Sequence, residues 1–144
     1  MVTLVKDAEE STWGVAFKVK GSEAYGTISY LNGREQGYST EEVTFYPTDR
    51  DMDPITVLVY IATEKSSCYL GPASDEAIAK QVVKAKGFSG TNTEYVLNLA
   101  SSMREIAPHI KDNHLYSLEA KVKELLSPGK DDTPKDFLRE VSFL

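Results

Sequence analysis

The sequence predicts an α+β fold in which a strand-rich N-terminal half precedes a helical C-terminal half. In the N-terminal half, aromatic and β-branched residues alternate at the period of two that β-strands show. In the C-terminal half, apolar residues recur at helical spacing, and the two kinds of element do not alternate along the chain as they do in parallel α/β folds. The 144 residues fit one domain. We expect it to span residues 1–126, with a tail over residues 127–144.

Four segments of the N-terminal half have the composition and period of strands. They cover residues 2–5, 13–19, 43–46 and 55–61. The last of these is almost wholly apolar, as in a strand that is covered on both faces. A short helix is expected over residues 22–31, followed by a loop that runs from Asn32 to Tyr38.

Three helices are expected in the C-terminal half. The first has apolar residues from Ile78 to Ala85, and residues 87–90 then form an ordinary connection to the second helix. Thr91 and Glu94 have capping-box spacing at the start of the second helix. Asp112 is expected to begin the third. A core is predicted from the apolar faces, which carry Ile78, Val82, Ala85, Val96, Leu99, Ala100, Met103, Ala107, Leu115, Leu118, Val122 and Leu125.

Charge and cysteine content limit the classes of partner and compartment. The net charge of −6 argues against a protein built to bind nucleic-acid phosphates or anionic lipid, so we expect small molecules or other proteins as partners. The single cysteine, Cys68, cannot form an intramolecular disulfide, and the first residues lack the pattern that predicts a secretory leader. These features predict a cytosolic protein with no nucleic-acid or membrane partner.

The familiar metal and phosphate motifs are absent from the sequence. Asp49, Asp51 and Asp53 imitate the start of a calcium loop, but Pro54 stands where that loop needs glycine and Tyr60 where it needs a bidentate glutamate. No phosphate-binding glycine loop is present either. We therefore expect no metal site.

Glu35 is the most promising candidate for chemistry. It follows the predicted helix in a glycine-bounded loop, next to Arg34 and close to Tyr30 and Tyr38. Desolvation beside aromatic rings makes a carboxylate a stronger base near neutral pH. The residues alone leave two interpretations open, a general base and a solvated carboxylate paired with Arg34.

Seven segments together resemble the ChaC-type gamma-glutamylcyclotransferases, the branch of the cyclotransferase superfamily that acts on glutathione. They include the tyrosine-leucine-asparagine-x-arginine-glutamate motif and occur in the family's order. The matching segments are residues 12–17, 30–35, 37–47, 59–63, 69–72, 87–95 and 112–115. The resemblance runs from Val2 to about Leu126 and so covers nearly the whole chain apart from the tail.

The resemblance implies a fold, a reaction and roles for particular residues. The implied fold is a small mixed β-barrel flanked by helices, and the implied reaction converts glutathione to 5-oxoproline and cysteinylglycine without a cofactor. Glu35 falls on the family's catalytic glutamate, and Tyr95 falls on a tyrosine that helps to hold the substrate. We expect Tyr38, just after Glu35, to bind substrate as well. For Tyr95 a core position at a helix start is an equally good interpretation.

One departure from the family pattern bears on activity. Relatives carry a first strand that ends in a tyrosine-glycine-serine-leucine loop, whose backbone amides cradle the substrate, and this sequence lacks that motif. We therefore expect the N-terminal strand of the barrel to be missing. Two hypotheses follow, a gamma-glutamylcyclotransferase and a truncated, catalytically inactive binding or regulatory form of the same family.

Overall fold

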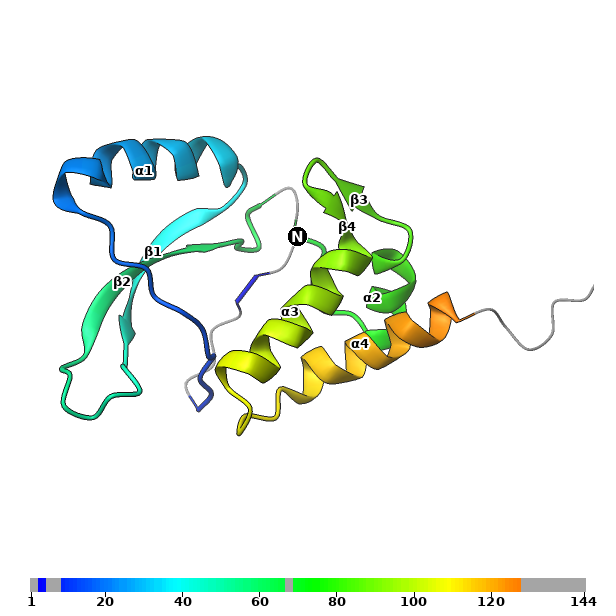
Figure 1. The fold of residues 1–144 in the computed structure, drawn as a ribbon. Coiled ribbons are helices and arrows are strands. Elements are labelled where there is room, and N and C mark those ends of the chain that lie inside the picture. Colours follow the sequence, from blue (N-terminus) through cyan, green and yellow to red (C-terminus); the bar gives the residue numbers. More distant parts are fainter. Residues whose placement is uncertain (1–2, 5–8, 67–68, 128–144) are drawn as a thin grey trace, which may run out of the picture. The chain divides into compact units, whose positions relative to one another are not determined.

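The computed structural model describes residues 3–4, 9–66 and 69–127. It groups the chain into two compact units, which meet in sequence between Pro72 and Ala73 (Figure 1). Both helices and strands are present, so the predicted mixed class is confirmed. Within the described ranges, no helix is both long and apolar enough to cross a membrane. The expectations for Cys68 and for the tail beyond Ser127 lie outside the described residues.

The first unit contains helix α1 (Gly21–Arg34) and a hairpin of strands β1 (Ser39–Phe45) and β2 (Ile55–Ile61). The strands are antiparallel, with Ser39 opposite Ile61 and Phe45 opposite Ile55. They confirm the two strands predicted over residues 43–46 and 55–61, although β1 begins four residues earlier. The acidic connection between them is a turn, in which the Asp51 backbone N–H donates to Asp49 Oδ1 over 3.0 Å.

Two other predicted strands have a different outcome. Half of the segment over residues 2–5 lies outside the described residues, but Thr3 Oγ1 accepts from Ala62 N over 2.8 Å just after the end of β2. The strand predicted over residues 13–19 is wrong, because this segment pairs with no strand among the described residues. Its alternation leaves Phe17 87% exposed. A period of two indicates an extended backbone, but a strand also needs a hydrogen-bonded neighbour.

The described strands form two separate two-stranded sheets and do not close into the expected barrel. One consequence is that β2 is covered less than its apolar sequence predicts. Ile55 and Leu58 are exposed, and burial is complete only at the Ile61 end of the strand. The faces of a sheet are buried only where helices or a second sheet pack on them, and adding strands at its edges does not cover them.

The second unit is built from helices α2 (Asp75–Val82), α3 (Asn92–Ile106) and α4 (Asn113–Leu126). Helix α4 packs against both α2 and α3. The predicted caps are confirmed, since Thr91 Oγ1 accepts from Glu94 N over 3.1 Å and Asp112 Oδ1 accepts from Leu115 N over 2.9 Å. The buried core includes Ala79, Val82, Val96, Ala100, Met103, Ala107, Leu115, Leu118 and Val122.

Two details of the helical half differ from the sequence-based expectations. Residues 87–90 are not a plain connection, because strands β3 (Lys86–Gly87) and β4 (Gly90–Thr91) form a small antiparallel hairpin there. Gly90 has φ +133°, a conformation that glycine adopts without strain and that admits this tight reversal. Leu125, predicted to face the core, is exposed in the last turn of α4, beyond the packed part of the helix.

Candidate active site

Glu35 lies at the point where α1 ends and the chain turns toward β1. Its backbone N–H still donates to the Leu31 carbonyl over 2.7 Å, but its ψ of 48° leaves the helical region. Its carbonyl then accepts from Tyr38 N over 3.2 Å, which closes a four-residue turn. The third residue of this turn, Gly37, has φ +86°, as a type II turn requires. The predicted position of Glu35, just after a short helix, is therefore confirmed.

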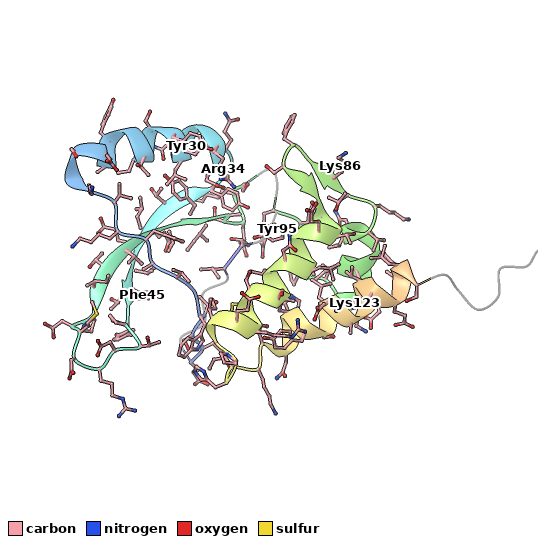
Figure 2. All side chains as sticks on the ribbon, in the orientation of Figure 1. Tyr30, Arg34, Phe45, Lys86, Tyr95 and Lys123 are labelled. Carbon is pink, nitrogen blue, oxygen red and sulfur yellow. The ribbon has the colours of Figure 1, made fainter. Side chains whose placement is uncertain are left out.

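Two side-chain contacts hold the residues around this turn. Arg34 Nε lies 3.4 Å from Glu35 Oε1, so the carboxylate is oriented by its neighbour at the C-terminal end of α1 (Figure 2). The Tyr60 hydroxyl donates to Asn32 Oδ1 over 2.8 Å and links the same end of the helix to β2. The second contact connects residues 28 positions apart in sequence. It fixes the distance between the helix end and the sheet.

Glu35 lines an open hollow of about 570 Å³. The hollow is lined by residues from the end of α1, the turn, the start of β1 and one position of β2, namely Asn32, Glu35, Gln36, Gly37, Tyr38, Ser39, Thr40 and Tyr60. The Glu35 side chain is 27% exposed, so it is partly shielded and still reachable from solvent. Most of the wall is polar, and among its described residues the ionisable groups are Glu35 and the two tyrosines.

A second hollow of about 390 Å³ shares part of this wall. Its lining residues are Gly37, Tyr38, Ser39, Thr63, Lys65 and Ser66. Tyr38 thus contributes to both hollows, which places it beside Glu35 as the sequence suggested.

Tyr95, the third predicted site residue, belongs to the second unit. It lies in the first turn of α3 and is 53% exposed (Figure 2). Its ring is therefore not part of the buried core of that unit, whose α3 members are Val96, Ala100 and Met103.

Sequence reasoning gave no site role to several residues of these walls, and Tyr60 and Lys65 are the most notable. Tyr60 was placed in the apolar strand over residues 55–61, and Lys65 was not interpreted. The antiparallel register brings Tyr60 opposite Thr40, close to the turn that carries Glu35. A predicted pairing of the two strands would have revealed Tyr60, whereas Lys65 has no signal in the sequence.

The resolved pKa shifts belong to ion pairs of the second unit. Hydrogen bonding from Arg104, opposed in part by burial, lowers the pKa of Glu119 to about 2. Hydrogen bonding between Glu76 and Lys121 lowers the pKa of the carboxyl and raises that of the ammonium. These pairs join α4 to its two neighbouring helices and are structural. The described part of the chain contains no cluster of three or more histidine, cysteine or acidic side chains that could hold a metal ion.

One protein family matches most of this chain. The model of the ChaC-like protein family matches residues 1–125, across both units. This chain belongs to the ChaC-like family. The family resemblance inferred from the seven sequence segments is therefore confirmed.

Individual relatives agree with this membership. The ChaC-like chain is 46% identical over 129 residues to glutathione-specific gamma-glutamylcyclotransferase 1 of Rattus norvegicus, with 88% of this chain and 58% of the relative covered. It is 37% identical over 137 residues to gamma-glutamylcyclotransferase 2-3 of Arabidopsis thaliana, covering 90% and 68%. The chain thus spans less than two thirds of the rat protein's length.

A solved structure shows the same fold relationship. The crystal structure of a yeast gamma-glutamyl cyclotransferase specific to glutathione matches with a TM-score of 0.64 at 26% identity. The match covers 74% of this chain and 57% of the yeast protein.

Proposed function

We propose that this chain is a gamma-glutamylcyclotransferase that converts glutathione to 5-oxoproline and cysteinylglycine, with Glu35 as the general base and acid. The observation that carries the proposal is the position of Glu35, a partly exposed glutamate that lines an open polar hollow at the end of α1. Membership of the ChaC-like family and the names of its relatives support the choice of glutathione.

The proposed reaction begins with a proton transfer. An α-amine is mostly ammonium at neutral pH, and in that form it has no lone pair for attack. The Glu35 carboxylate accepts one ammonium proton, and the freed amine attacks the γ-amide carbonyl carbon to form the five-membered ring. The C–N bond to cysteinylglycine then breaks, and Glu35 returns the proton to the departing amine. The ring nitrogen releases its second proton to solvent, which leaves the single N–H of the lactam. Positioned proton transfer of this kind contributes on the order of 10²–10⁴ in rate.

Ring closure joins two groups of one molecule, so positioning supplies a second large contribution. Effective molarities for well-oriented intramolecular reactions reach about 10⁵–10⁸ M. The wall of the hollow offers side chains that can hydrogen-bond a folded glutamyl arm, including Asn32, Gln36, Ser39 and Thr40. We assign Tyr38 and Tyr95 as further substrate contacts. Tyr38 lines the hollow, and the exposed ring of Tyr95 is available to a ligand.

A product assay tests this proposal against the binding alternative. The purified chain is incubated with glutathione, and 5-oxoproline and cysteinylglycine are quantified together by mass spectrometry. We expect equal amounts of the two products, because each turnover releases one of each. Saturable glutathione binding without either product would instead identify a binding protein of the same family.

The proposed cytosolic location has its own test. A fluorescent fusion of the chain is expected to distribute through the cytosol, and enrichment in an organelle or at a membrane would contradict it.

A further inference from the structure

The second hollow differs from the first in the sign of its charge. Among the described residues of its wall, Lys65 alone is charged at neutral pH, and none of them is acidic. The remaining positions are one glycine and four hydroxyl-bearing residues, Tyr38, Ser39, Thr63 and Ser66. An ammonium group that lines the same hollow as several hydroxyl-bearing residues has the chemistry that binds a carboxylate. This positive site stands out in a chain whose net charge is −6.

The backbone presents Lys65 at a tight turn directly after β2. The Ser66 N–H donates to the Thr63 carbonyl over 2.9 Å, which closes the turn around Glu64 and Lys65. Lys65 is exposed and makes no ion pair with any described residue. Glu64, its neighbour on the turn, does not line the hollow. The ammonium is therefore available to a ligand.

The two hollows adjoin, and the length of their common wall suits the proposed substrate. They share Gly37, Tyr38 and Ser39, and two peptide steps from the first to the third of these residues span at most about 7 Å. The leaving group of glutathione is also two residues long and ends in a free carboxylate. With the γ-amide beside Glu35, an extended cysteinylglycine moiety crosses Tyr38 and brings its carboxylate to the second hollow.

We propose that the second hollow is the subsite for the C-terminal carboxylate of the substrate, with Lys65 as its charged ligand. The inference rests on the proposed function, because it takes the scissile amide to lie beside Glu35. Lys65 would make the protein prefer γ-glutamyl peptides that end in a free carboxylate two residues beyond the scissile bond. Lys65 acts in substrate binding and leaves the proton transfer at Glu35 unchanged.

The test compares two substrates and two charge-reversal variants. The substrates are glutathione and glutathione with a C-terminal amide, which differ only in the charge at that end. The variants are Lys65→Glu and Lys18→Glu. Lys18 is an exposed lysine of the same unit that lines neither hollow. We expect Lys65→Glu to raise the KM for glutathione about tenfold with kcat within about twofold, which is the effect of losing one charge-assisted contact.

The substrate comparison distinguishes a local contact from a general change in charge. The KM for the amide substrate should be nearly equal in the wild type and in Lys65→Glu, and Lys18→Glu should match the wild type for both substrates. The proposal is overturned if the two variants raise the KM for glutathione equally, or if Lys65→Glu impairs both substrates to the same degree.

A binding measurement separates this proposal from the proposed function. Calorimetric titration of the Glu35→Gln chain with glutathione and with its amide needs no turnover. If the wild type makes no 5-oxoproline but glutathione binds more tightly than the amide in a Lys65-dependent way, the reaction is wrong and the carboxylate subsite stands. If neither ligand binds, or both bind equally, the subsite is wrong.

Discussion

The buried ion pair at Glu119 allows a stability prediction from the structure. Glu119 lies on α4 with only 5% of its surface exposed, and Arg104 of α3 contacts both of its carboxylate oxygens. Lys123 Nζ adds a contact of 2.8 Å from the next turn of α4. The Arg104 guanidinium also lies over the Tyr116 ring, with 4.6 Å between its central carbon and the ring centroid. Glu119 thus connects two helices.

The magnitude follows from the pKa of this carboxyl. Lowering the pKa from 4.5 to about 2 corresponds to about 3 kcal/mol of stability from the ionised form. Arg104 and Lys123 are 49% and 60% exposed, so water screens their part of the interaction and both recover hydration when Glu119 is removed. We therefore expect Glu119→Gln to lower the free energy of unfolding by about 2 kcal/mol at neutral pH.

The sign of the pH dependence is fixed by the direction of the shift. A carboxyl with a lowered pKa in the folded state stabilises the fold fully above its unfolded pKa and loses that effect as the pH falls through its folded pKa. The difference between the wild type and Glu119→Gln should therefore be constant above about pH 5 and shrink between 4.5 and about 2. Urea unfolding followed by circular dichroism measures it at each pH.

Glu124→Gln is the matched control, because Glu124 is an exposed residue of the same helix. Its effect should stay below about 0.5 kcal/mol at every pH. Equal destabilisation by the two variants at neutral pH, or a Glu119→Gln difference that persists at the acid end, would refute the reasoning.

Three further predictions concern the candidate site. Gly37→Ala forces a residue with a Cβ into φ +86° and should destabilise the first unit by about 1–2 kcal/mol. Thermal unfolding measures this loss, and an unchanged melting temperature would contradict the turn geometry. Tyr60→Phe removes the hydroxyl that donates to Asn32, so we expect the free energy of unfolding, measured in urea, to fall by about 1 kcal/mol. An unchanged free energy would show that the fold does not need this contact. Tyr95→Phe should raise the KM for glutathione with little change in kcat; an unchanged KM would remove Tyr95 from the substrate site.

Local signals in the sequence predicted the helical half well. Thr91 and Asp112 each place a capping oxygen three residues before a helical N–H, so their effect depends only on neighbouring residues. The apolar faces of α3 and α4 were predicted for the same reason, because helical periodicity is encoded within a few turns. The prediction that Leu125 faces the core is wrong, because burial at the end of a helix depends on which other elements pack there.

Features that depend on distant contacts were not predictable in the same way. The segment over residues 13–19 has the alternation of a strand but pairs with no described strand. The small hairpin at residues 86–91 has no apolar pattern from which it could be predicted. The site shows the same division. The position of Glu35 could be predicted from local signals, a helix end and a glycine turn. Tyr60 and Lys65 reach the two hollows only because β2 pairs with β1.

The most direct test of the account is the rate of 5-oxoproline formation from glutathione by three proteins, the wild type, Glu35→Gln and Glu42→Gln. Glu42 is an exposed glutamate of β1 that lines neither hollow, so the two variants carry the same change in charge. We predict that Glu35→Gln lowers kcat by at least about 10²-fold with normal folding, while Glu42→Gln stays within about twofold of the wild type. A Glu35→Gln chain that forms 5-oxoproline at the wild-type rate would contradict the central claim.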